Sequence, residues 1–133
     1  LVRDKPGDRD QEITAITLDE RLLVSPGLAV EHAREAVVQM ANIARQNYLS
    51  AIGLLFQYDR KVVERINENE DVVDKLEDRV DTLEEEMRDK HIERLSKNEC
   101  NPSAGVVFLD ILSNLERISD HAYNVAGYVK DEL

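Results

Sequence analysis

The strongest constraint on the fold is a long, uninterrupted helical periodicity in the middle of the chain. Between Val62 and Leu95, apolar residues recur three or four positions apart, so they share one side of an α-helix. A helix of this length exceeds the usual globular length and cannot bury its apolar stripe alone, so we expect long antiparallel partners. The stripe consists of Val62, Val63, Ile66, Val73, Leu76, Val80, Leu83, Met87, Ile92 and Leu95.

A second helical pattern precedes this one. Ser25 is a favourable N-cap residue and Pro26 suits the first helical position, where its missing N–H costs nothing. The predicted helix continues to about Gln57, and a break at Tyr58 and Asp59 separates it from the central helix. Its apolar stripe is Ala33, Val37, Met40, Ala44, Ala51 and Leu55, widened near the end by Ile52, Leu54 and Phe56.

A third helical pattern follows the loop "SKNECNPS", in which Pro102 and Ser103 open the helix. Its predicted buried face is Phe108, Leu109, Leu112, Leu115, Ala122, Ala126 and Val129. Glycines are few and no alternating pattern predicts strands. The sequence therefore predicts an all-α fold, an antiparallel up-down-up three-helix bundle over residues 14–133, preceded by a flexible polar leader or linker at residues 1–13.

Composition excludes several classes of function. The net charge of −11 argues against a nucleic-acid binder, because contacts to phosphates need clustered Lys and Arg. No apolar run approaches the roughly 20 residues of a membrane-spanning helix, so we expect no membrane insertion of this segment. The residues 130–133 spell "KDEL", an endoplasmic-reticulum retrieval signal, but they continue a helical segment and no secretory leader is visible, so we interpret the match as coincidence.

Two helices carry the same acidic pattern beside their apolar stripes. On the central helix "DKLEDRVD" places Glu77 about 40° and Asp81 about 80° from Val73 around the axis. On the third helix "ERISD" places Glu116 and Asp120 at the same angles from Leu112. If the two helices are neighbours, these acids and Asp74 converge in one groove.

Such a group of carboxylates has two interpretations. Unpaired acids repel one another, and a bound hard cation such as magnesium, calcium, manganese or ferric iron would relieve that repulsion. Alternatively, the acids pair with Arg79, Arg117 and similar residues on a solvated face. Periodicity alone favours the second interpretation, since Glu and Asp four apart are common on surface helices.

Catalytic motifs are not visible in the sequence. The di-iron motif Glu-x-x-His is absent, because the residues three before the histidines are Ala29, Arg88 and Ile118. We therefore expect His32, His91 and His121 to be ordinary surface or boundary residues. No phosphate-binding loop or nucleophile motif appears, and Cys100 is the single cysteine, so we predict a protein that is not an enzyme.

Two segments resemble a known family. "DILSNLERISDHAYNVAGYV" resembles the final-helix motif of PhoU-like domains, and "VVDKLEDRVD" resembles their second-helix motif, Asp-x-x-Glu-x-x-x-Asp. The likeness spans roughly Leu18 to Val129 and departs from the family at Ser119, where glycine is usual. It implies a single three-helix PhoU repeat, a role in phosphate homeostasis, and a polynuclear metal (iron, zinc or manganese) held through the acidic motifs. By matching position, the implied metal ligands are Asp74, Glu77, Asp81, Glu116 and Asp120, with Asn124 as a weaker addition.

A narrower resemblance concerns two segments, residues 18–33 and residues 100–125. "LDERLLVSPGLAVEHA" and "CNPSAGVVFLDILSNLERISDHAYNV" are similar to the cytosolic C-terminal domain of bacterial sodium/phosphate cotransporters. It implies a membrane transport domain upstream in the same polypeptide and a location on the cytoplasmic side of the bacterial inner membrane. Stand-alone PhoU proteins contain two bundles and this chain has room for one, so a homodimer would have to supply the second.

These observations predict a non-enzymatic regulatory domain in phosphate homeostasis, attached to a sodium-dependent phosphate transporter and able to bind metal. Two alternatives remain open at this point: a structural or dimerisation bundle without metal, and a free-standing regulator of phosphate uptake.

Overall fold

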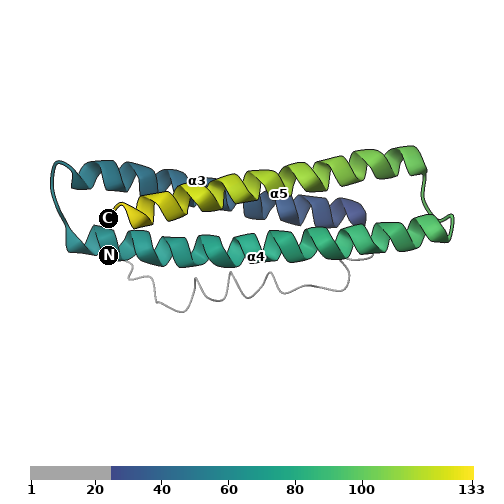
Figure 1. Ribbon diagram of the computed structural model, residues 1–133, viewed down its shortest axis with the longest axis horizontal. Helices are drawn as coiled ribbons and strands as arrows, with labels where there is room; N and C mark the ends of the chain where they lie inside the picture. Colours follow the sequence, from purple (N-terminus) through teal and green to yellow (C-terminus); the bar gives the residue numbers. More distant parts are fainter. Residues whose placement is uncertain (1–24) are drawn as a thin grey trace, which may run out of the picture.

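Three long helices make up the part of the chain that the computed structural model describes, residues 25–133 (Figure 1). Helix α3 spans Pro26–Leu54, α4 spans Arg60–Ser96 and α5 spans Pro102–Asp131. Each helix packs against the other two, and short links at both ends make the order up, down, up. The predicted all-α three-helix bundle is confirmed, and the leader predicted for residues 1–13 lies outside the described residues.

Local sequence explains where the helices begin. The side chain of Asp59 accepts a hydrogen bond from the Lys61 N–H at 2.9 Å, which caps α4. The side chain of Asn101 does the same for α5, accepting from the N–H of Ser103 and of Ala104. Ser25 lies at the predicted start of α3, but its side chain makes no capping hydrogen bond, so only its position was predicted.

The core lies along the axis shared by the three helices. It forms two adjoining groups of buried side chains, in which each helix contributes residues from the predicted stripes. One group is Ala36, Val37, Met40, Ala44, Val73, Leu76, Val80, Ala122 and Ala126. The other is Ala29, Ala33, Leu83, Met87 and Leu112.

The predicted stripes were wrong near two helix ends. Leu55 is 82% exposed and Phe56 is 86% exposed, because α3 ends at Leu54 and both residues lie in the link to α4. Ile92 is also exposed, at 57%. The core position in that turn belongs to His91, four residues after buried Met87, and Ile92 is rotated a further 100° away.

The prediction that His91 is a surface or boundary residue was wrong, because its side chain is buried, at 3% exposure. Its ring packs against Phe108, with 5.6 Å between ring centroids. Gly105 makes this possible, since a Cβ atom there would lie 2.4 Å from the His91 Cε1. The space for the ring comes from a residue on the next helix, which a motif search around the histidine does not reveal.

A buried polar contact fixes the alignment of α3 against α4. Asn47 is 1% exposed, and its Nδ2 donates to the backbone oxygen of Ile66 at 3.2 Å. Asn69 Nδ2 donates in turn to Asn47 Oδ1 at 2.8 Å. A shift of one helix turn would leave these groups buried without partners, so the contact favours this register.

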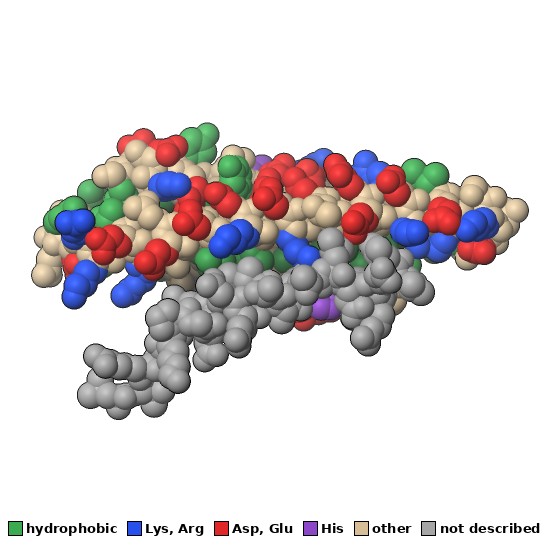
Figure 2. All heavy atoms as spheres, turned by 90° about the horizontal axis from the view of Figure 1, so that it is seen from below, with side chains coloured by type: hydrophobic (Ala, Val, Ile, Leu, Met, Phe, Trp, Pro, Cys, Tyr) green, Lys and Arg blue, Asp and Glu red, His purple; other side chains and the backbone are tan. Residues whose placement is uncertain are grey.

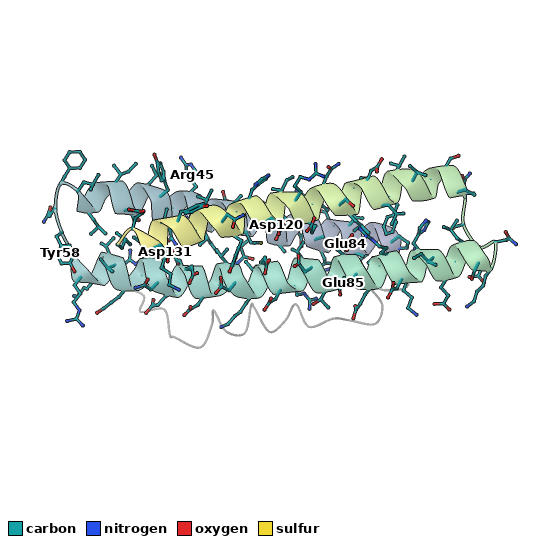
Figure 3. All side chains as sticks on the ribbon, in the orientation of Figure 1. Arg45, Tyr58, Glu84, Glu85, Asp120 and Asp131 are labelled. Atoms are coloured by element: carbon teal, nitrogen blue, oxygen red, sulfur yellow. The ribbon has the colours of Figure 1, made fainter. Side chains whose placement is uncertain are left out.

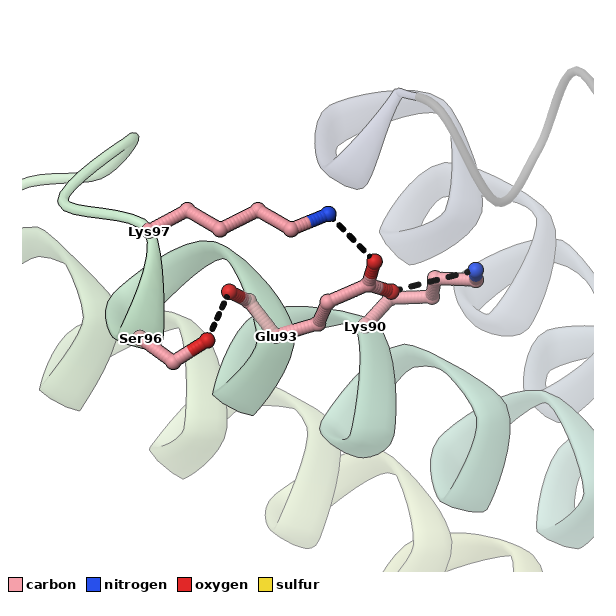
Figure 4. A network of polar contacts seen from close by, with 4 residues as sticks. All are labelled: Lys90, Glu93, Ser96 and Lys97. Atoms are coloured by element: carbon pink, nitrogen blue, oxygen red, sulfur yellow. Dashed lines mark hydrogen bonds and ion pairs between the residues drawn. The ribbon is translucent and has the colours of Figure 1, made fainter.

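The last turns of α4 carry an exposed network of charges (Figure 4). Glu93 accepts from Lys97 Nζ at 2.6 Å and from Lys90 Nζ at 3.3 Å, while Ser96 Oγ donates to the Glu93 backbone oxygen. Ion pairs this exposed contribute little to stability, about 0.5 kcal/mol each. This network therefore neutralises Glu93 at the surface, but it does not determine the fold.

Candidate metal centre

A row of acidic side chains follows the side of α4 that faces α5. The residues Glu70, Asp74, Glu77, Asp81 and Glu84 are alternately four and three positions apart, so they project from one edge of the helix. Across from them, Glu116 and Asp120 lie on α5, and Figure 3 shows Asp120 between the two helices near the middle of the bundle. Figure 2 shows how densely acidic side chains cover the face of the molecule that α4 forms. We call this row and its partners on α5 the acidic groove.

Three of the predicted ligands meet in the centre of the acidic groove. Glu77, Asp81 and Asp120 each offer a carboxylate oxygen, and these three oxygens all lie within 4.8 Å of one another. Two come from α4 and one from α5, so the group joins the two helices. The juxtaposition of acids from both helices, expected from their angles to the apolar stripes, is present.

The other two predicted ligands lie beside this central group. Asp74 belongs to a second group with Glu70 and Asp71, whose oxygens also lie within 4.8 Å of one another. Glu116 belongs to neither group, but burial raises its pKa and the charges of Asp120 and Asp81 raise it further. The structure therefore brings together three of the five residues directly and places two as neighbours.

The environment of these acids disfavours their charged form. Burial raises the pKa of Glu77 and of Asp81, and the nearest carboxylates of the groove raise both pKa values further. The pKa of Asp74 is raised by burial and then by the charge of Glu70, and burial is also the main cause for Glu116. The acidic groove thus concentrates negative charge in a partly dehydrated space.

Ion pairs neutralise both ends of the row. Lys130 Nζ contacts Glu70 Oε2 at 2.5 Å, and Glu70 is only 7% exposed. At the opposite end, Arg88 pairs with Glu84 and also reaches Ser113 Oγ on α5 at 3.4 Å. Sequence reasoning missed both pairs: Lys130 with Glu70 depends on which turns of α4 and α5 lie side by side, whereas Glu84 and Arg88 are four apart on α4, a spacing visible in the sequence.

The centre of the groove has no such compensation. Within residues 25–133, none of the five predicted ligands forms an ion pair, so the alternative pairing with Arg79 and Arg117 is not found there. The Oδ1 atoms of Asp74 and Asp81 are buried and have no hydrogen-bond partner among these residues. Unsatisfied carboxylate oxygens facing other carboxylates fit the oxygen ligands that hard cations require.

The raised pKa values predict how stability depends on pH without metal. Because the folded protein binds protons more tightly than the unfolded chain, it holds more protons just above the ordinary pKa values of 3.8 for Asp and 4.5 for Glu. The free energy of unfolding therefore falls as the pH rises from these ordinary pKa values through the raised pKa values of the folded protein. We expect a larger free energy of unfolding at pH 5 than at pH 7, measured by urea denaturation with a chelator; a steady gain towards pH 7 would contradict this.

The pair between Lys130 and Glu70 predicts a second effect. Lys130→Ala leaves the buried carboxylate of Glu70 unpaired beside Asp71 and Asp74. We expect this change to lower the free energy of unfolding by about 1–3 kcal/mol. Adding Glu70→Gln removes the unpaired charge and should restore most of the loss in a chemical denaturation experiment. The matched control is Lys75→Ala at an exposed position of α4. If Glu70→Gln fails to rescue Lys130→Ala, the pair is not what stabilises this end.

Comparison with known proteins then identifies the family. The PhoU domain model matches residues 37–129, which is most of the chain and includes all five predicted ligands. The chain belongs to the PhoU domain family. Neither curated proteins nor solved structures gave a match. PhoU domains are regulatory, and membership indicates a role in the regulation of phosphate homeostasis. In the described part of this PhoU domain, no helix is both long and apolar enough to span a membrane.

Proposed function

We propose that this PhoU domain is a non-enzymatic regulatory domain that controls phosphate transport and whose acidic groove binds metal. The observation that carries the proposal is the central group of Glu77, Asp81 and Asp120, with oxygens within 4.8 Å of one another and without ion-pair partners in residues 25–133. A cation held there neutralises charge that otherwise destabilises the bundle.

The residues present suit a metal bound through oxygen atoms. Glu77, Asp81 and Asp120 would hold it, and Asp74 and Glu116, which belong to the same acidic groove, would serve a second ion. Bound iron, zinc or manganese would supply positive charge that ties α4 to α5. Because the ligands come from two helices, metal occupancy would change the rigidity of the α4–α5 edge, which gives a regulatory domain a state to report.

The transporter context is a further part of the proposal. The cotransporter resemblance supports a membrane transport domain that precedes Leu1 in the full-length polypeptide, with this bundle on the cytoplasmic side of the bacterial inner membrane. The upstream reading frame tests it. We expect several hydrophobic spans there; a start codon just before Leu1, or a second bundle, would contradict the transporter context and favour a free-standing regulator of phosphate uptake.

A test in cells separates the regulatory proposal from a purely structural bundle. We expect the Asp81→Asn/Asp120→Asn variant to lose the change in phosphate uptake that follows transfer between low and high phosphate. The matched control is Asp89→Asn/Glu99→Gln, which removes two charges at exposed positions outside the groove. If cells with the groove variant change their phosphate uptake as wild-type cells do, at an equal protein level, the acidic groove has no regulatory role.

A further inference from the structure

The face of the bundle opposite α4, formed by α3 and α5, carries an exposed apolar surface. On α5, Val107, Ile111, Ile118, Val125 and Tyr128 are between 41% and 72% exposed. These residues lie on the edge of α5 that turns away from the acidic groove, since Glu116 and Asp120 point to the other side of buried Ser119.

The spacing of these residues is that of a helix-packing seam. Residues 104, 107, 111, 114, 118, 121, 125 and 128 are alternately three and four positions apart, which keeps them in line along the helix. Only Asn114 and His121 interrupt the apolar character, and no acid occupies the line in a chain with 28 acidic residues. We call these eight positions the α5 seam. A seam of this length on an exposed edge is suited to a second helix.

Helix α3 widens the surface beside the α5 seam. Met40 contacts Ser119 across the core, so the two parallel helices lie side by side at this level. On the α5 side of the outer surface of α3, Tyr48 is 54% exposed and Ile52 is 37% exposed. At the C-terminal end of the α5 seam, the apolar surface therefore extends over two helices.

Charges beside the α5 seam make it complementary to itself. Asp110 and Arg117 are exposed, flank the seam and form no ion pair within residues 25–133. They lie on either side of Asn114, so an antiparallel twofold approach of two α5 helices brings Asp110 of each copy near Arg117 of the other. The same approach brings Ile111 of each copy near Ile118 of the other, which buries the apolar positions together.

We propose that a second copy of this chain docks on the α3–α5 face, with the two α5 helices antiparallel about a twofold axis near Asn114. The partner is a second copy because one pair of opposite charges and one pair of isoleucines satisfy both protomers at once. The acidic grooves remain open on the outer sides of the dimer. The proposal is therefore independent of metal binding, and a homodimer does not need to build a shared metal site.

Sedimentation velocity on the full chain tests the proposal. Wild type should sediment as a dimer of 15.2 kDa protomers at micromolar concentration. Ile118→Asp should weaken association about tenfold or more, because it buries a charge in the seam. The matched control is Ile92→Asp, the same change at a 57% exposed position of α4, outside the α3–α5 face, and this variant should remain dimeric. Far-UV circular dichroism checks that both variants fold.

A charge exchange tests the antiparallel register itself. Asp110→Arg and Arg117→Asp should each weaken the dimer, and the double variant should restore it. A wild-type monomer across the concentration range would overturn the proposal and leave the face for a different protein. A dimer unaffected by Ile118→Asp, or one that the double variant does not restore, would overturn it as well.

Discussion

In metal-free buffer, the Asp81→Asn/Asp120→Asn variant is expected to melt at a higher temperature than wild type. Both replacements remove charge from a group in which neighbouring carboxylates repel one another and have no ion-pair partner in residues 25–133. Relief of this repulsion is worth about 1 kcal/mol in total, or a rise of about 4 °C in melting temperature for a domain of this size.

With added metal, wild type should instead melt at a higher temperature than the variant. At a free metal concentration of about 100 times Kd, binding stabilises wild type by about 2.7 kcal/mol, or roughly 10 °C. The variant keeps only one of the three carboxylates in the central group, because a neutral amide replaces each of the other two, and it should not respond. Differential scanning calorimetry with and without manganese or zinc measures both parts of the prediction.

A change in overall charge alone would give a different result. The variant Asp89→Asn/Glu99→Gln removes the same two charges from exposed positions outside the acidic groove. It should keep the wild-type response to metal and show less of the metal-free rise. If groove and control variants respond alike, the repulsion is spread over the whole surface and the groove has no special role.

Truncation of Leu83 should produce the largest loss of stability among single changes. Leu83 is 2% exposed and packs with Met87, Leu112 and two alanines of α3, so it joins all three helices. Leu83→Ala removes this packing and leaves a cavity, which costs about 2–5 kcal/mol. Leu55→Ala is the matched control at an 82% exposed position and should cost about 0.5 kcal/mol or less.

Urea denaturation of the two variants also tests the packing of α4. Equal losses from Leu83→Ala and Leu55→Ala would mean that the apolar stripe of α4 does not face the core at this turn. The comparison uses the same chemical change in both cases, so differences in side-chain size do not enter it.

Comparison of Leu83 with Leu55 also shows what the sequence could predict. Periodicity predicts the presence and the buried side of a long helix such as α4, because every turn repeats the same information. It does not predict where a neighbouring helix ends, and Leu55 and Phe56 therefore fall outside the core despite suitable spacing. The burial of His91 depends on Gly105 of another helix and was not predictable from local pattern either.

The same distinction applies to the acidic groove. The angles of Glu77, Asp81 and Asp120 to their apolar stripes predict which side of each helix they occupy. Their mutual distance, and the pairing of Glu70 with Lys130, depend on the alignment of α4 with α5 along the axis. Buried contacts such as Asn47 with Ile66 set alignment between helices, and no short motif encodes them.

The metal content of natively purified protein tests the central claim most directly. We expect elemental analysis to find one or more equivalents of a transition metal per chain, lost when Glu77, Asp81, Glu116 and Asp120 are all changed to alanine. Metal-free wild type whose melting temperature does not change with added iron, zinc or manganese would contradict the claim that the groove between α4 and α5 is a metal site.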